Sequence, residues 1–206
     1  MPTNKCRICL KPLTTDATLT SFISRPPICY RCFSKLQILC KELKIDGCKT
    51  YILYEYEETL MELIYQYKGA YDIALAEVFP GYFLAELRRR YFGYTIVPIP
   101  SNVEDDIKRG FNHIVEIAEV IGLPIATIIE KNKYWKQSEM KVKERKNIAQ
   151  VLEMKKNCHI PKRVLILDDI MTTGSTVKSA IALLRRSGAV KIKVLLIAKK
   201  MSKNDG

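Results

Sequence analysis

Two adjacent acids followed by a run of small hydroxyl residues are the most informative feature of this 206-residue sequence. Asp168 and Asp169 end an apolar run typical of a buried strand, and the loop that follows contains Thr172, Thr173, Gly174, Ser175 and Thr176. The backbone N–H groups and hydroxyls of such a loop suit a phosphate dianion, especially where a helix begins. Paired carboxylates suit vicinal hydroxyls or Mg²⁺, so the segment predicts a site for a phosphorylated sugar. The alternative is a threonine-rich helix cap beside a surface pair of acids.

Four of the seven cysteines form two pairs of the C-x2-C type, and 19 residues separate the pairs, which are Cys6 with Cys9 and Cys29 with Cys32. Two such pairs can supply four thiolates to one tetrahedral centre, which is the geometry of structural zinc. Because protein ligands would fill all four positions, we expect the zinc to be structural rather than catalytic. A redox pair or ordinary buried thiols are the alternatives, and the duplication of the pair disfavours the redox interpretation.

The elements that would position these residues follow from the spacing of the apolar residues. The expected strands or short apolar runs are 51–56, 94–99, 126–129, 164–167 and 194–198, and the expected helices are 60–67, 72–91 with a break at Pro80-Gly81, 114–121 and 177–187. Their alternation predicts the α/β class, with a mostly parallel sheet flanked by helices. Residues 33–39 are expected to form a short helix, and a small zinc module over 1–48 would precede the main domain over 49–206.

The charge balance favours an anionic partner, because 34 Lys and Arg residues against 22 Asp and Glu residues give a net charge of +12. Two stretches carry this excess, with +6 in residues 1–50 and +8 in residues 131–163. Such concentration is expected of a groove for a nucleic-acid backbone. Tyr134 and Trp135 lie in the second stretch and could stack on bases. The alternative is a solvated, lysine-rich helix around 141–156 with Trp135 packed against it.

Membrane insertion is not expected from this sequence. The longest segment without a charge runs from Tyr91 to Val103, and its 13 residues include two prolines. A membrane-spanning helix needs ~20 apolar residues. The first six residues contain no apolar run of the kind that directs export. We therefore expect a cytoplasmic protein.

The pattern acid-acid-x-x-Thr-Thr-Gly-x-Thr over residues 168–176 resembles the sugar-phosphate loop of the type I phosphoribosyltransferases. With the two cysteine pairs in front of it, the chain resembles the ComF family in particular. Three further stretches support this resemblance and extend it over nearly the whole chain: Val97-Pro98-Ile99-Pro100 followed by Arg109-Gly110-Phe111-Asn112, a segment with Gln137, Arg145 and Asn147, and Lys68 after Gln66-Tyr67.

The resemblance implies a site for phosphoribosyl pyrophosphate (PRPP) together with Mg²⁺. Residues 172–176 would hold the 5-phosphate, and Asp168 and Asp169 would face the ribose hydroxyls. Lys68 and Arg109 would meet the pyrophosphate; otherwise Lys68 is a solvated helix end and Arg109 a surface-loop residue. The sequence indicates a donor of phosphoribose and no acceptor.

The ComF family is associated with natural transformation, and this implies a role in DNA uptake. Single-stranded DNA and a companion helicase (ComFA-like) are the partners that the resemblance implies. Two classes of function stay open: an enzyme that transfers phosphoribose in nucleotide salvage or to an unknown acceptor, and a binding module that does not turn over. The zinc module weakens the salvage interpretation, since nucleotide salvage does not require one.

Overall fold

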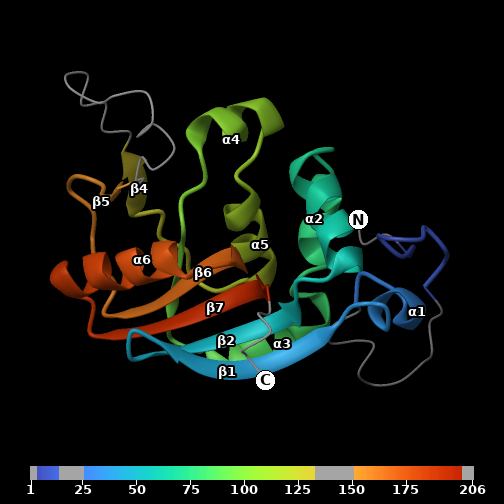
Figure 1. Cartoon of the computed structure of the whole chain (residues 1–206), viewed down its shortest axis with the longest axis horizontal. Coiled ribbons are helices and arrows are strands. Elements are labelled where there is room, and N and C mark those ends of the chain that lie inside the picture. Colours follow the sequence, from blue (N-terminus) through green and yellow to red (C-terminus); the bar gives the residue numbers. More distant parts are fainter. Residues whose placement is uncertain (1–3, 14–25, 133–150, 201–206) are drawn as a thin grey trace.

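A computed structural model describes residues 4–13, 26–132 and 151–200 of the chain (Figure 1). Its centre is a five-stranded sheet in the order β1-β2-β7-β6-β3. The strands are β1 (Ile38–Ile45), β2 (Cys48–Glu55), β3 (Thr95–Pro98), β6 (Arg163–Met171) and β7 (Lys191–Lys199). All neighbouring strands run parallel except β1 and β2, which are antiparallel. The predicted mostly parallel sheet is therefore confirmed.

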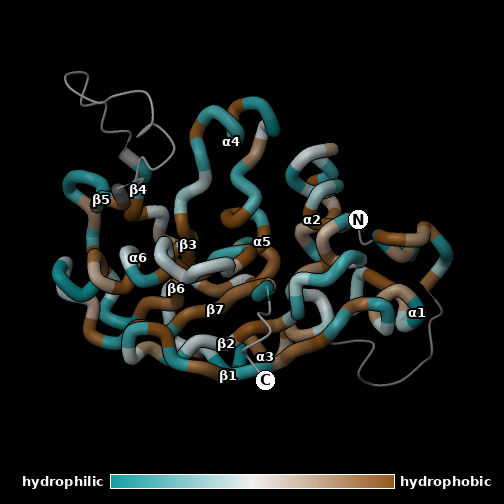
Figure 2. Tube along the Cα trace, in the orientation of Figure 1, coloured by the Kyte–Doolittle hydropathy of each residue, from teal (hydrophilic) through white to brown (hydrophobic). Residues whose placement is uncertain are grey.

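The central strands β6 and β7 are covered on both faces. Their apolar runs at 164–167 and 194–198 are buried, and Figure 2 shows hydrophobic residues along both strands. Strands buried on two faces read as continuous apolar runs rather than as alternating patterns. This explains why the sequence indicates these two strands clearly.

Helices cover the two faces of the sheet. On one face lies α6 (Ser175–Arg186), and on the other lie α2 (Glu58–Lys68), α3 (Leu84–Arg90) and α5 (His113–Ile121). Helix α6 buries Val177, Ala180, Ile181 and Leu184, whose spacing of three and four residues forms one apolar stripe. The flanking helices expected from the sequence are thus present.

The predicted helix over 72–91 is divided as expected near Pro80-Gly81. It consists of two 3-10 helices, η2 (Ile73–Glu77) and η3 (Gly81–Phe83), followed by α3. A side chain at position 81 would place its Cβ 2.5 Å from Pro27. The N-terminal segment therefore packs so closely here that glycine is required.

A short helix and a two-stranded hairpin lie outside the five-stranded sheet. Helix α4 (Val103–Arg109) follows β3, and β4 (Ile129–Asn132) pairs with β5 (Val151–Met154) in an antiparallel hairpin (Figure 1). The apolar run expected at 126–129 is only partly a strand, because β4 begins at Ile129 and Ile125 forms a single bridge with Ile96.

The short helix predicted over residues 33–39 is wrong. Helix α1 (Tyr30–Phe33) is a single turn, and the chain then extends into the edge strand β1. Pairing with β2, the next strand along the chain, supplies the backbone hydrogen bonds of this segment and overrides the helical pattern. Because β1 belongs to the large sheet, we propose that the boundary between the two parts lies nearer residue 37 than residue 48.

The helices in the described ranges are short. Helix α6 has 12 residues and α2 has 11, whereas crossing a bilayer takes ~20. Within residues 4–13, 26–132 and 151–200, no helix has both the length and the apolar character of a membrane span.

Candidate phosphate and metal sites

The acids and the hydroxyl loop lie at the carboxyl end of β6, where parallel sheets hold their ligands. Strand β6 continues through Asp168 and Asp169 to Met171, so the acids are part of the strand rather than of the loop. Helix α6 begins at Ser175, two residues before the predicted start. Ser175 and Thr176, the last two residues of the predicted loop, therefore lie in the first turn of α6.

The loop presents its polar groups to solvent. Thr172, Thr173, Ser175 and Thr176 are all exposed. The hydroxyl of Thr173 donates to Ser175 Oγ (3.1 Å) and accepts from the Ser175 N–H (3.4 Å). Gly174 is the N-cap and has no side chain to cap the helix, so N–H groups of the first turn beyond that of Ser175 can meet an anion.

Gly174 fixes the shape of the loop. Its φ is +73°, in the left-handed region that glycine adopts without steric cost. A Cβ at this position would also lie 3.2 Å from Met171 Sδ. Only glycine gives this turn between strand and helix without displacing its neighbours.

The two acids have different surroundings. Asp169 Oδ2 contacts Lys68 Nζ and lies 3.2 Å from His113 Nε2, and Asp169 Oδ1 accepts the N–H of Ile170 at 2.7 Å. Asp168 Oδ1 accepts the N–H of Asp169 at 3.0 Å. The Asp169 carboxylate thus contacts a cation and an imidazole, whereas the Asp168 carboxylate accepts the backbone N–H of Asp169.

These surroundings move the two pKa values in opposite directions. Burial and the charge of Asp169 raise the pKa of Asp168 to about 7. Burial would also raise the pKa of Asp169, but the hydrogen bond from His113 and the charge of Lys68 outweigh it and hold this pKa well below its usual range. Such separation of two carboxyl groups is typical of functional sites.

Arg109 and His113 complete a hydrogen-bonded network behind the acids. The Arg109 guanidinium donates to the carbonyl of Lys68 (3.2 Å) and lies 2.9 Å from His113 Nδ1. A guanidinium can only donate, so Nδ1 accepts and the imidazole proton sits on Nε2, facing Asp169. Burial lowers the pKa of His113, which favours this neutral form. Tyr67 Oη donates to the carbonyl of His113 at 2.6 Å and fixes the start of α5.

The structure brings together the acids, the loop, Lys68 and Arg109, all of which the sequence singles out. The Lys68 side chain is 30% exposed and that of Arg109 is 7% exposed, so neither is a freely solvated group. Sequence reasoning missed His113. Its only signal is its place directly after Asn112, at the end of the Arg109–Asn112 motif.

A cavity of about 440 Å³ lies beside the loop, a size common for small-molecule sites. Thr172, Thr173 and Gly174 line one side of it, and Lys178, Lys199 and Lys200 add positive charge. The surroundings of the loop therefore favour a phosphorylated ligand.

The four paired cysteines also meet. The sulfurs of Cys6, Cys9, Cys29 and Cys32 all lie within 4.8 Å of one another, and those of Cys9 and Cys29 are 3.8 Å apart. Zn–S bonds of ~2.3 Å in a tetrahedron give S–S separations of about 3.8 Å. The cluster can therefore hold a metal ion with four protein ligands.

The metal-binding segment packs against the elements that precede α3. Arg7 forms a salt bridge with Glu77 (2.9 Å), and the rings of Phe33 and Tyr82 stack 3.7 Å apart. Tyr82 Oη also donates to the carbonyl of Ile28 at 3.1 Å. The segment is thus fixed to η2 and η3 by contacts from several of its residues.

Some residues singled out in the sequence lie outside the described part of the chain. They are Tyr134, Trp135, Gln137, Arg145 and Asn147. Their predicted roles stay predictions.

Comparison with known proteins shows which proteins this chain is similar to. The model of the phosphoribosyl transferase domain matches residues 108–205, which include Arg109, both acids and the loop. Competence protein ComFC of Streptococcus pneumoniae strain R6 is 29% identical over 163 residues, which cover 79% of this chain and 73% of that protein. Competence protein ComFC of Bacillus subtilis strain 168 is 24% identical over 214 residues, covering 89% of each. Over most of its length, the chain is therefore similar to the ComFC competence proteins.

The chain combines a four-cysteine group with the fold of a type I phosphoribosyltransferase. Among solved structures, it is similar to a purine phosphoribosyltransferase from Pyrococcus horikoshii Ot3, with 18% identity and a TM-score of 0.38. That match covers 60% of this chain and 73% of the archaeal one.

Proposed function

We propose that this ComFC-like protein binds PRPP with Mg²⁺ at the end of β6 and acts in DNA uptake. One observation carries the proposal: an acid pair lies near the carboxyl end of β6, an exposed hydroxyl loop follows the last residue of that strand, and Lys68 contacts the second acid. Groups that suit a phosphate, hydroxyls and a pyrophosphate therefore lie near one another, which supports the proposal. Along the chain, Lys68, the acids and the loop come in the order of the pyrophosphate, the ribose and the 5-phosphate.

Each part of PRPP has a partner in this arrangement. The N–H groups and hydroxyls of residues 172–176 bind the 5-phosphate, and the ribose hydroxyls donate to Asp168 and Asp169. The Lys68 ammonium leaves Asp169 and pairs with the pyrophosphate. Arg109 continues to donate its hydrogen bond to the Lys68 carbonyl and so holds the end of α2 in place. Mg²⁺ brought by PRPP neutralises the pyrophosphate.

The four cysteines hold structural zinc in this proposal. Burial acts to raise the pKa of Cys6, but the N–H groups of Cys9, Cys29 and Ile8 outweigh it and lower this pKa to about 6, which favours a thiolate. Burial and the neighbouring thiols raise the pKa of Cys32 instead. The metal would supply the stability that so small a segment cannot gain from its own apolar core. With four protein ligands no position is left for a substrate.

Phosphoribosyl transfer itself is a second candidate function. It is favoured by the completeness of the site, since the loop, both acids and Lys68 are all in place. Transfer needs the protein chiefly to orient PRPP and to stabilise developing charge. The acceptor is then a nucleotide-salvage base or another nucleophile.

Two observations support the choice of partners. Two relatives bear the name competence protein, and the net charge is +12. We therefore propose single-stranded DNA and a ComFA-like helicase as partners, in the cytoplasm.

Calorimetric titration of PRPP with Mg²⁺ into the whole protein tests the site. We expect saturable binding that is lost in Asp168→Asn/Asp169→Asn and kept in Asp105→Asn, which removes an exposed acid of α4. Thr172→Val/Thr173→Val should also weaken binding without touching the acids. If the wild type does not bind PRPP, the loop recognises another phosphate and the proposal fails.

A further inference from the structure

A row of lysines crosses the sheet at the end opposite the acids. In the β1–β2 pair, Lys44 lies opposite Lys49. Lys49 in turn lies beside Lys193 of β7, because the next position is the parallel pair of Thr50 with Val194. Residues at matching register point to the same face of a sheet, so these three lysines share one face.

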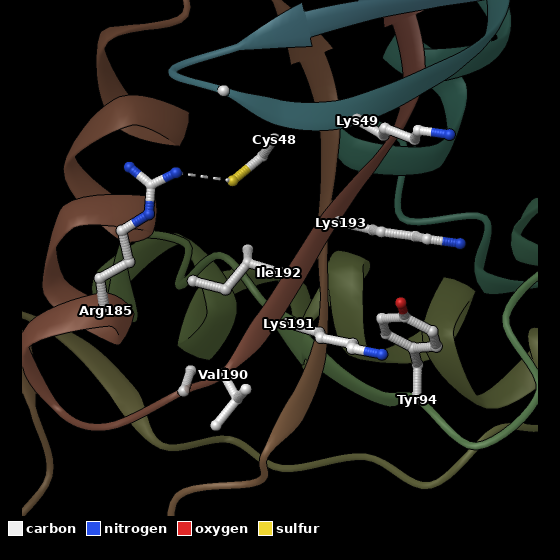
Figure 3. A pocket seen from close by; sticks show the side chains of 10 residues that line it. Cys48, Lys49, Tyr94, Arg185, Val190, Lys191, Ile192 and Lys193 are labelled. Atoms are coloured by element: carbon white, nitrogen blue, oxygen red, sulfur yellow. Dashed lines mark hydrogen bonds between the residues drawn. The ribbon is translucent and has the colours of Figure 1, made fainter.

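Two more cations extend the row on the same face. Lys191 precedes Lys193 by two positions on β7, and Arg163 of β6 is its register partner. Figure 3 shows Lys49, Lys193 and Lys191 with their ammonium groups directed to the same side of the sheet. We call Lys49, Lys191, Lys193 and Arg163 the amino-end basic face; Lys44 is not counted in it, because Lys44 also lines the cavity beside the loop.

Aromatic rings order the cationic groups of this face. The Lys193 ammonium lies 4.9 Å from the centre of the Tyr94 ring, and the Arg163 guanidinium lies 4.5 Å from the same ring. Lys49, Lys191, Lys193 and Tyr94 line a cavity of about 330 Å³ (Figure 3). A second cavity, of about 510 Å³, is lined by Arg163 and Lys162.

The positive charge of this face is not neutralised within the described parts of the chain. None of Lys49, Lys191 and Lys193 is in a salt bridge there. The nearby acids Asp46 and Glu42 are already paired, with Arg185 and Arg90. Like charges on neighbouring strands, ~4.8 Å apart, repel one another. A bound polyanion would relieve this repulsion.

An exposed aromatic ring lies at one end of the face. The side chain of Phe92 is 81% exposed in the turn before β3. Its neighbour Gly93 lies so close to Arg163 that a Cβ there would be 3.3 Å from the guanidinium. A linear array of cations beside a free ring fits single-stranded nucleic acid, whose phosphates and bases need these two groups.

We propose that the amino-end basic face binds the backbone of single-stranded DNA, with Phe92 stacked on a base. The choice of DNA as the ligand rests on the proposed function. Arg163 and Asp168 are five residues apart on β6, which is about 16 Å along a strand. DNA on this face therefore leaves the PRPP site open, and the two ligands bind together.

The test compares two triple variants of the whole protein that lose the same charge. Lys49→Gln/Lys191→Gln/Lys193→Gln removes three cations of the face. Lys35→Gln/Lys155→Gln/Lys156→Gln removes three exposed lysines from the two basic stretches of the sequence. Fluorescence anisotropy of a labelled single-stranded oligonucleotide is measured over a range of salt concentrations.

We expect the first variant to lose at least about tenfold in affinity and to lower the slope of log K against log salt by about 2, since each phosphate contact contributes ~0.7. The control variant should bind nearly as the wild type does. Phe92→Ser should lose about tenfold without changing the slope. Urea unfolding verifies that every variant is folded. If the triple variant is not folded, Lys49→Gln/Lys191→Gln, at two exposed positions, replaces it.

Three results would overturn the inference: equal loss in the two triple variants, competition between PRPP and DNA, or duplex DNA bound as tightly as single strands. Absence of DNA binding by the wild type would instead remove the DNA part of the proposed function. The PRPP titration is read separately, so failure of the phosphate site is distinguished from both.

Discussion

Replacing Asp168 with asparagine should stabilise the protein above neutral pH, although this residue lies in the proposed ligand site. Burial and the neighbouring Asp169 raise the pKa of Asp168 to about 7, against ~3.9 in an unfolded chain. Between these values the folded state binds more protons than the unfolded state, so stability falls as the pH rises through this window. From ~3.9 to about 7 is about 3 pKa units, which at ~1.36 kcal/mol each is about 4 kcal/mol.

That figure is the most that Asp168→Asn can recover at pH 8. The substitution keeps the shape of the side chain and an oxygen that can accept the Asp169 N–H, an interaction of 3.0 Å. At about pH 4, where the carboxyl is protonated in the folded protein, variant and wild type should be equally stable. The gain should therefore grow from about pH 4 to about pH 7 and then level off.

Asp169→Asn is the matched comparison, and its effect should have the opposite sign. Although burial acts against it, His113 and Lys68 hold the pKa of Asp169 below its usual range. Its carboxylate therefore contributes stability above ~3.9, and this contribution is lost as the pH falls through the lowered folded-state pKa. Removing it leaves Lys68 without its counter-ion and should cost about 1–3 kcal/mol at pH 7.

Urea unfolding of the three proteins at several pH values between about 4 and 8, without added metal or PRPP, measures these differences. We expect the curve of Asp168→Asn to rise above that of the wild type and the curve of Asp169→Asn to fall below it. If Asp168→Asn is no more stable than the wild type at pH 8, burial of the Asp168 charge does not cost what the structure implies. The PRPP titration should show that Asp168→Asn, although more stable, has lost affinity for PRPP. Such a loss is expected because residues of a binding site often lower the stability of the protein.

Two further predictions concern the metal cluster and the loop. Cys29→Ser should release zinc and expose the N-terminal segment to proteases. The control Cys40→Ser, at an exposed cysteine outside the cluster, should keep the metal. A Cys29→Ser protein that keeps all its metal and resists proteases would refute the ligand set. Gly174→Ala places a side chain at a residue with φ +73° and against Met171, which should cost about 1–2 kcal/mol of stability and weaken PRPP binding about tenfold. Urea unfolding measures the stability, and calorimetry measures the affinity. Unchanged affinity would show that the loop does not hold the phosphate.

The spacing of residues along the chain was enough to predict the cysteine cluster, the acid pair with its loop, and the central strands. Each of these is a local pattern. Two residues between cysteines direct both sulfurs to one centre, and a strand buried on two faces must be apolar at every position. The structure brings all four predicted sulfurs together and leaves the acids at the end of β6.

Tertiary structure decided what depends on partners far away in the sequence. Residues 38–45 form a strand because they pair with β2, which is itself held in the sheet by β7 from the other end of the chain. His113 reaches Asp169 only because α5 packs beside β6. The amino-end basic face combines a lysine of β2 with two from β7, a strand that lies outside the two basic stretches of the sequence. Register across a sheet joins residues more than a hundred positions apart, and no local pattern carries that information.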